Sequence, residues 1–197
     1  MAGSWLDNAV GKKIVSLAAA QPLDDWSKNG AKTAMDRLAG VAETVVDEHP
    51  MPPVPAHLSE DAKKLFAAGH EIYHRDAHCA TCHQPNGKGL DPAFPPLEKS
   101  PWVTGSCDRL IKLTLHGLMG PLEVNGKKYD GNVPMTPFGG MLKDEEVAAV
   151  LTYVRNHFGN QADPITPAQV AQVREATKDR KVFYQTSDLL KEHPLEK

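Results

Sequence analysis

The chain lacks the features that would place it in several large classes of protein. No apolar run approaches the roughly 18 residues that a membrane-spanning helix needs, so no span is predicted. A net charge of −3 provides no basic field for nucleic acid. Three cysteines in 197 residues are too few for a disulfide scaffold. Residues 1–20 also lack the basic start and unbroken apolar core of a secretory signal peptide.

The remaining composition is that of an ordinary globular protein. Hydrophobic residues make up 41% of the chain and charged residues 24%, so a packed core is expected. Four prolines within residues 48–58 predict a semi-rigid linker between two parts of the chain. We therefore expect a helical extension over residues 1–47, a main domain over 59–180 and a tail with a short helix over 181–197.

The extension, residues 1–47, has helical apolar spacing in two stretches that are separated by a turn signal at Pro22. This pattern predicts a helical hairpin. Its large apolar residues are too few for a core of its own. Two interpretations stay open: a docking element for a partner or parent chain, and a cap over the main domain.

The main domain is expected to be all-α with one small β-hairpin. Ser59 followed by two acidic residues predicts a helix start. Asn125-Gly126 predicts a two-residue type I′ turn, and hence a hairpin near 121–131. Residues 84–104, rich in glycine and proline, are expected to form one long loop. Further helices are predicted over 108–118, 144–158 and 167–178, with a last short helix from about Ser187.

One motif carries chemistry: Cys79-Ala80-Thr81-Cys82-His83, a C-x-x-C-H sequence. On one helical turn, two thiols at this spacing can each bond a vinyl group of a porphyrin, and the adjacent histidine can bind its iron. A zinc site would need a second Cys/His pair, and only Cys107 remains. A thioredoxin-type redox pair would need a βαβ context, which is missing. The motif therefore predicts one covalent haem c per chain.

An iron held by His83 needs a sixth ligand or an open site. The candidates are Met119, Met135, Met141 and the eight other histidines. We favour Met135, because Pro134 and Pro137 stiffen its loop and a rigid loop can hold a weak thioether ligand. The other two methionines are interpreted as packing residues.

Several residues are expected around such a haem. The rigid, free carbonyl of Pro95 is expected to accept from the second ring nitrogen of His83. Trp102, Tyr129 and Phe138 are interpreted either as haem-lining residues or as ordinary core aromatics. His116 is interpreted either as a contact to a haem propionate or as a buried, hydrogen-bonded histidine. Cys107 is expected to be a small buried side chain rather than a reactive thiol.

Over residues 65–178 the sequence resembles class I cytochrome c domains. Similarity is strongest to the branch that serves or is fused to bacterial quinoprotein sugar and alcohol dehydrogenases, and to tails of dehydrogenase-like chains and copper nitrite reductases. The resemblance rests on residues 73, 78–83, 95–97, 102–103, 115–118, 120–122, 135–139, 144–148, 151–156 and 159–160.

This resemblance implies a cytochrome c fold, with His83 and Met135 as axial ligands and the Pro95 carbonyl bracing His83. A helical-repeat segment often precedes the cytochrome in multidomain chains of this kind, so the resemblance also implies that residues 1–47 are the end of such a segment. The chain departs from the family at two positions. Thr136 follows Met135 where the family has proline, and the ligand is expected to survive because Pro137 is kept. Lys143 replaces a serine cap, so Asp144 is expected to cap the next helix instead.

The predicted function is an electron carrier, not an enzyme. It would take single electrons from a partner or fused dehydrogenase and pass them to a downstream acceptor. The alternative is a haem enzyme or gas sensor with an open or labile distal site. Since covalent haem attachment resembles an export-side process, a periplasmic or otherwise exported location is expected. The missing signal then indicates a fragment of a longer protein.

Overall fold

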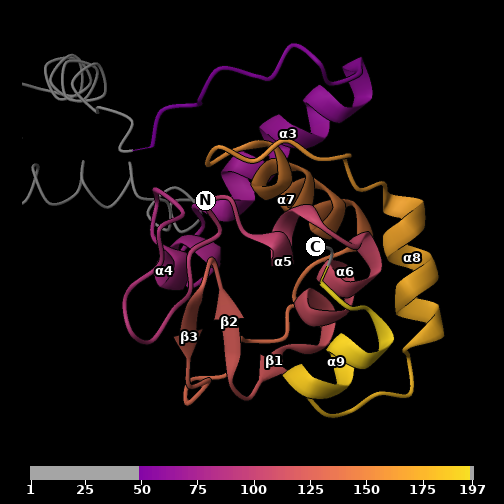
Figure 1. Cartoon of the computed structure of the whole chain (residues 1–197). Coiled ribbons are helices and arrows are strands. Elements are labelled where there is room, and N and C mark those ends of the chain that lie inside the picture. The colour runs from indigo at the N-terminus through magenta and orange to yellow at the C-terminus, as the bar shows by residue number, and fades with distance from the viewer. Residues whose placement is uncertain (1–48, 196–197) are drawn as a thin grey trace, which may run out of the picture. The chain divides into compact units, whose positions relative to one another are not determined.

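The computed structural model describes residues 49–195 (Figure 1). The helices predicted within residues 1–47 lie outside the described residues. The chain divides into two units, Met1–Pro50 and Met51–Lys197, and every named element belongs to the second. This unit is mostly helical, as predicted. Its helices are α3 (Glu60–Tyr73), α4 (Cys79–His83), α5 (Pro101–Thr104), α6 (Cys107–His116), α7 (Asp144–Asn156), α8 (Pro167–Ala176) and α9 (Thr186–Glu192).

The helices begin where local side chains form capping hydrogen bonds. The Ser59 hydroxyl accepts from the Ala62 N–H at 3.3 Å and caps α3, as predicted. Thr166 and Gln169 form a capping box at the start of α8. The expectation for α7 is wrong. Lys143 remains the N-cap residue, because its backbone N–H donates to the Glu146 carboxylate at 3.0 Å. Asp144 instead binds a residue of α8.

Two further expectations about local structure are corrected. Residues 84–104 are not one loop, since α5 occupies their last turn. The Ser100 hydroxyl caps this helix and Pro101 stands at its first position, a signal that the sequence did contain. The helix predicted to reach residue 118 ends at His116. Gly117 has a positive φ of 76°, which ends α6 and lets the chain turn into a strand.

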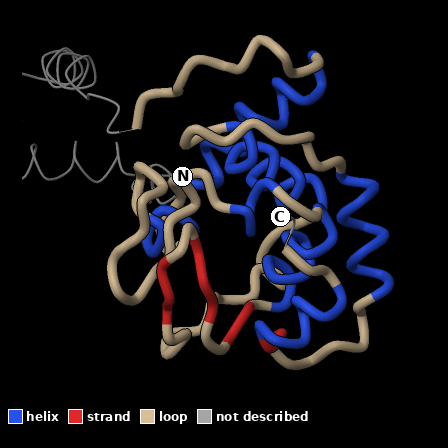
Figure 2. The backbone as a smooth tube through the Cα atoms, in the orientation of Figure 1, coloured by secondary structure: helices blue, strands red, loops and turns tan. Residues whose placement is uncertain are grey.

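The strands form two small two-stranded sheets, drawn in red in Figure 2. The predicted hairpin is present, and Asn125 and Gly126 both have the positive φ that a type I′ turn requires. The second sheet, a parallel pair of a mid-chain strand and a C-terminal strand, was not predicted. The strands are β1 (Leu118–Met119), β2 (Leu122–Val124), β3 (Lys127–Tyr129) and β4 (Tyr184–Gln185).

The central packing contact joins α3 to α7. Gly69 lies against the backbone of Ala149, and only the absence of a side chain allows this approach. The rings of Phe66 and Tyr153 pack beside this crossing at 5.1 Å. The crossing fixes the end of α3, from which the chain leads directly to the C-x-x-C-H motif.

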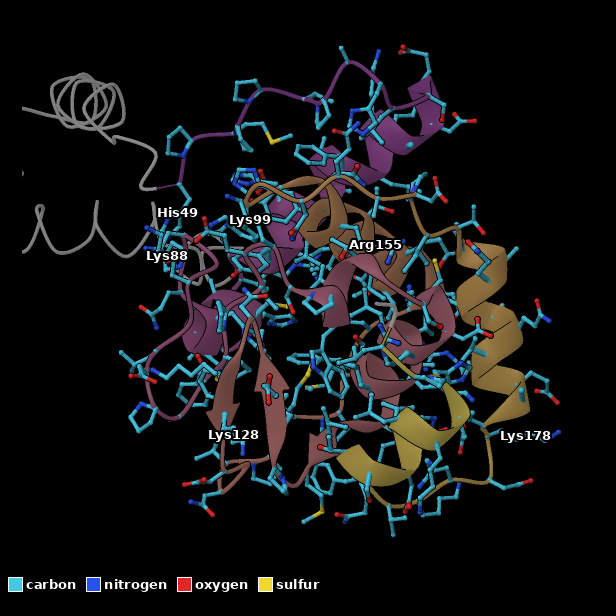
Figure 3. The ribbon with its side chains drawn as sticks, viewed as in Figure 1. His49, Lys88, Lys99, Lys128, Arg155 and Lys178 are labelled. Atoms are coloured by element: carbon cyan, nitrogen blue, oxygen red, sulfur yellow. The ribbon has the colours of Figure 1, made fainter. Side chains whose placement is uncertain are left out.

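Arg155 ties α7 to the neighbouring segment. It lies between α5 and α7 (Figure 3), and its guanidinium donates to the carbonyls of Val103 and Gly105 at 2.6 and 2.8 Å. Within residues 49–195, no helix combines the length and apolar character needed to cross a membrane.

Candidate functional site

A cavity of about 360 Å³ lies between the C-x-x-C-H helix, the hairpin and the inner faces of α6 and α7. This volume falls in the range of roughly 300–1,000 Å³ typical of cofactor sites. Its wall is mainly apolar, with leucine and valine side chains from several elements. The apolar lining residues of α6, β1, the hairpin and α7 are Leu110, Leu113, Leu118, Leu122, Val124, Val150, Leu151 and Val154.

All three functional residues of the motif line this cavity. Cys79, Cys82 and His83 lie on the single turn of α4, so their spacing along the chain becomes proximity in space. The Tyr73 hydroxyl donates to the carbonyl of Gln84 at 2.7 Å and ties the end of α3 to the end of α4. Burial raises the pKa of Tyr73, so its hydroxyl keeps the proton that this bond needs.

The imidazole of His83 is oriented by a backbone carbonyl. Its Nδ1 donates to the Pro95 carbonyl at 2.9 Å, the contact expected from the sequence. Because a carbonyl can only accept, the proton must be on Nδ1, and Nε2 keeps its lone pair. Burial lowers the pKa of His83, against an opposing effect of this hydrogen bond. The neutral, metal-binding form of the ring is therefore favoured.

The two motif thiols are kept neutral. Burial raises the pKa of Cys79 to about 12 and also raises the pKa of Cys82. Both sulfurs therefore carry their hydrogen at neutral pH.

Met135 lines the same cavity from the loop after the hairpin. Its backbone N–H donates to the Leu118 carbonyl at 2.8 Å, and its carbonyl accepts from the Leu118 N–H at 3.4 Å. The residues on either side of it in the loop, Pro134 and Thr136, are exposed, whereas Met135 is half-buried. The other two candidate methionines are not in the cavity wall. Met141 is 54% exposed, so the expectation that it packs as an apolar plug is wrong.

The three predicted aromatic residues, Trp102, Tyr129 and Phe138, all line the cavity and are nearly fully buried. Trp102 is fixed by its Nε1–H, which donates to the Glu123 carbonyl at 2.9 Å and holds the hairpin against α5. They form part of both the cavity wall and the hydrophobic core.

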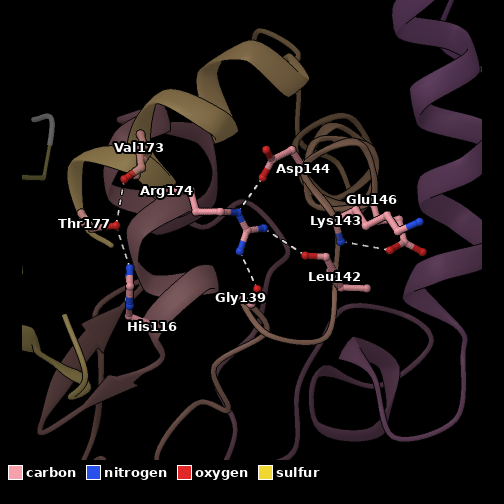
Figure 4. Close-up of polar contacts among 9 residues, drawn as sticks. All are labelled: His116, Gly139, Leu142, Lys143, Asp144, Glu146, Val173, Arg174 and Thr177. Carbon is pink, nitrogen blue, oxygen red and sulfur yellow. Dashed lines mark hydrogen bonds and ion pairs between the residues drawn. The ribbon is translucent and has the colours of Figure 1, made fainter. Parts of the chain in front are cut away.

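His116 is the one predicted site residue that the structure does not place in the cavity wall. Its Nε2–H donates to the Thr177 hydroxyl at 2.7 Å, because that hydroxyl itself donates to the Val173 carbonyl (Figure 4). Of its two interpretations, the hydrogen-bonded histidine is the one observed. Cys107 is also absent from the wall, and as the first residue of α6 it is half-buried.

The sequence does not single out the apolar residues that complete the wall. Helical spacing identifies which face of a helix is buried, but it does not say whether that face meets another helix or a cavity. Only the arrangement of α6, α7 and the hairpin separates these cases.

The chemistry of the wall fits a haem. The cavity offers apolar surface for a macrocycle, two neutral thiols on one helical turn, an imidazole with a free Nε2 and a soft thioether sulfur. Among residues 49–195, no cluster of three or more histidine, cysteine or acidic side chains is arranged to hold a bare metal ion.

Comparison with known proteins also supports a haem as the cofactor. The family model described as cytochrome c matches residues 66–158. Cytochrome c-552 of Thermus thermophilus is 40% identical over 117 residues, which cover 55% of this chain and 85% of that protein. The cytochrome c subunit of a quinone-dependent alcohol dehydrogenase from Gluconacetobacter polyoxogenes is 26% identical over 151 residues, which cover 71% of this chain and 31% of that subunit.

The fructose dehydrogenase cytochrome subunit of Gluconobacter japonicus is 32% identical over 110 residues, which cover 52% of this chain and 21% of that subunit. This chain therefore spans a third or less of the two dehydrogenase subunits, but most of the Thermus protein. Similarity at 40% identity across most of a whole relative, together with the family match over the motif and α7, shows that the chain belongs to the cytochrome c family, with covalently bound haem c and a role in electron transfer.

Proposed function

We propose that Cys79 and Cys82 attach the haem, that His83 and Met135 are its axial ligands, and that the holoprotein passes single electrons from a dehydrogenase to a downstream acceptor. The observation that carries this proposal is the convergence of all four side chains on one apolar cavity. Once bound, haem c supplies an iron that alternates between ferric and ferrous states.

The protein's own residues prepare and hold this group. Cys79 and Cys82 would hold the haem through two thioether bonds; in forming each one, the sulfur would bond one vinyl carbon and the thiol hydrogen would pass to the other. The neutral state of Cys79 and Cys82 retains the hydrogen that this addition needs. His83 presents Nε2 because the Pro95 carbonyl occupies Nδ1. This bond also makes the imidazole a stronger donor to iron.

Met135 and the apolar wall set the redox properties. A thioether ligand favours the ferrous state and raises the potential, which suits an acceptor of electrons from a dehydrogenase. The apolar wall excludes water and disfavours the extra charge of the ferric state. With His83 and Met135 both holding the iron, no position on it would be left for a substrate, and the chain would act as a carrier rather than an enzyme.

A dehydrogenase is the proposed electron donor, because cytochrome subunits of alcohol and fructose dehydrogenases are among the relatives. Redox encounters of this kind use small, transient interfaces. The export-side location of haem attachment, expected from the motif, makes the periplasm the proposed compartment.

The first test is the optical spectrum of the holoprotein, produced in a host that attaches haem covalently. We expect a sharp α-band on reduction. In the oxidised protein, the weak long-wavelength charge-transfer band of a thioether-ligated ferric haem is expected. High-spin bands or rapid carbon monoxide binding would contradict Met135 ligation and favour an open distal site. Absence of covalent haem would overturn the assignment of Cys79 and Cys82.

A further inference from the structure

The loop that carries Met135 is held by a part of the chain beyond residue 158, where the cytochrome c family match ends. Leu118 bonds Met135 through both of its backbone groups, as described above. On its other edge, β1 pairs in parallel with β4, with Leu118 opposite Tyr184. The three segments thus form a small continuous hydrogen-bonded array, with Met135 on one side and the C-terminal segment on the other.

The C-terminal segment is itself anchored at both ends of this array. The Thr186 hydroxyl donates to the Met119 carbonyl at 3.0 Å and covers the end of β1. Further along, the fully buried guanidinium of Arg109 donates to the carbonyls of His193 and Pro194 at 3.1 and 2.7 Å. Because these bonds fix the segment against α6, β4 is a built part of the fold and can support β1.

A second support acts on the segment that follows Met135, residues 138–142. Arg174 of α8 reaches the segment that follows Met135, where it donates to the carbonyls of Gly139 and Leu142 and pairs with Asp144 (Figure 4). The Leu142 contact is 2.9 Å and the Asp144 contact 2.6 Å. Charge-assisted bonds from one planar guanidinium hold two backbone carbonyls and one carboxylate in a fixed relation.

The same segment is bonded from its other side by α6. The Phe138 N–H donates to the Thr114 carbonyl at 2.9 Å, and the Gly139 N–H donates to the Leu115 carbonyl at 3.0 Å. Residues 138–142 are therefore held between the end of α6 and Arg174. The bond from His116 to Thr177 joins the ends of α6 and α8 and keeps these two supports together.

We propose that α8 and the segment through β4 act as a clamp that keeps Met135 on the iron, with Arg174 as its main positioning residue. This inference rests on the proposed function, in which Met135 is the axial ligand. An iron–thioether bond is weak, so the rigidity of the loop decides how often the sulfur leaves. The clamp lowers that frequency and protects the iron from external ligands.

The test measures how fast imidazole replaces Met135 in the ferric holoprotein, by stopped-flow at saturating imidazole. Arg174→Gln removes the contacts to Gly139, Leu142 and Asp144, and we expect the replacement rate to rise about tenfold or more. Arg174→Lys keeps the positive charge but loses the several N–H donors of the planar guanidinium, so an intermediate replacement rate is expected.

Lys178→Gln is the matched control. It removes the same charge just beyond the end of α8 (Figure 3). Among residues 49–195, the side chain of Lys178 pairs locally with Glu175 and makes no recorded contact to the loop that carries Met135. Its replacement rate is expected to equal that of the parent protein.

Thr186→Val tests the support from β4. It also provides an independent test of the clamp if Arg174→Gln does not fold. It removes the hydroxyl bond to Met119 while keeping the side-chain shape, and a rise of about two- to fivefold is expected. Gly69→Ala, which weakens the distant α3–α7 contact, controls for general loss of stability. An equal rise in that variant would overturn the clamp.

The ligation by Met135 and the clamp are overturned by different results. If the parent protein and Met135→Ala bind imidazole at the same rate, Met135 is not the ligand and the proposed function is wrong at that point. If the parent shows thioether ligation but Arg174→Gln and Thr186→Val exchange at the parental rate, the clamp alone is overturned.

Discussion

The two sides of the cavity are built in different ways. On the side of α4, both thiols and the imidazole come from five consecutive residues, and the brace for His83 comes from Pro95, only 12 residues further on. On the side of Met135, a single half-buried residue in an otherwise exposed loop is held by Leu118, with support from β4 and α8.

This difference separates attachment of the cofactor from control of its iron. A local motif can bond the haem wherever its helix is formed, because the necessary distances are set within one turn. The position of Met135, the proposed second ligand, depends on contacts between segments far apart in sequence. We therefore expect that substitutions on the distal side change redox and ligand-binding properties while the haem stays attached.

The largest effect is expected at the motif. The double variant Cys79→Ala with Cys82→Ala should contain no covalent haem, because no thiol remains to bond a vinyl group. Haem staining after denaturing electrophoresis and intact mass measure this directly. Cys107→Ala is the control, since Cys107 lies outside the cavity wall, and it should retain a full complement of haem. Attached haem in the double variant would contradict the assignment.

Met135→Ala should keep the haem but change its potential. Loss of the thioether removes the ligand that favours ferrous iron, so the midpoint potential should fall by about 0.1 V or more, part of the roughly 0.8 V range that axial ligands set. Protein-film voltammetry or a redox titration measures it. Met141→Leu should leave the potential unchanged, because Met141 is 54% exposed and outside the cavity wall. An unaltered potential in Met135→Ala would exclude ligation by this residue.

Gly69→Ala tests the frame that supports the motif. A methyl group there would clash with the Ala149 backbone and with Tyr153, so α3 and α7 must separate. We expect a loss of about 1–3 kcal/mol in the free energy of unfolding, measured by denaturant titration. Gly140→Ala is the control, because its added carbon meets nothing within 4 Å, and its stability should change by less than about 0.5 kcal/mol. Equal stability of the two variants would show that the close crossing is not required.

The smallest effect concerns an ion pair beside the same frame. The hydrogen bond from Arg75, at 2.8 Å, lowers the pKa of Glu146, and the Lys143 N–H lowers it further. Because the pKa of Glu146 is lower in the folded protein than its ordinary value of 4.5, the carboxylate stabilises the fold at pH values above 4.5. This stabilisation is lost as the pH falls through the pKa of the folded protein. Because the pair is partly exposed, Glu146→Gln should cost only about 0.2–1 kcal/mol at neutral pH.

Thermal unfolding of this variant from pH 7 down to about pH 2 should show the cost disappearing in acid. Glu145→Gln, an exposed position in the same helical turn, should show a smaller cost throughout. A cost for Glu146→Gln that persists unchanged at the lowest pH would contradict the ion pair as its cause.

The sequence predicted the elements whose signals are local. The cap at Ser59, the capping box at Thr166 and the turn at Asn125-Gly126 are all present, because each depends on residues within one or two turns of chain. The short helix α5 was missed because the surrounding glycine and proline residues favoured a loop. Ser100 as N-cap and Pro101 at the first helical position are nevertheless signals of a helix start.

Predictions that depended on tertiary contacts were less successful. His116 lies on an apolar helix, but its partner is Thr177 from a distant segment rather than the cavity. Met141 was expected to pack, yet it is exposed. Asp144 was expected to cap α7, but Arg174 binds its carboxylate and the Glu146 side chain performs the capping. For His116 and Asp144, a residue far away in sequence supplies the contact.

By itself, the sequence determined the haem cofactor, the residues proposed to attach it and the mainly helical class, because all three depend on short-range spacing. Only the tertiary structure decided which leucines and valines form a cavity, and how Met135 is supported. Those properties arise where α6, α7, the hairpin and β4 meet, and no spacing along the chain contains that geometry.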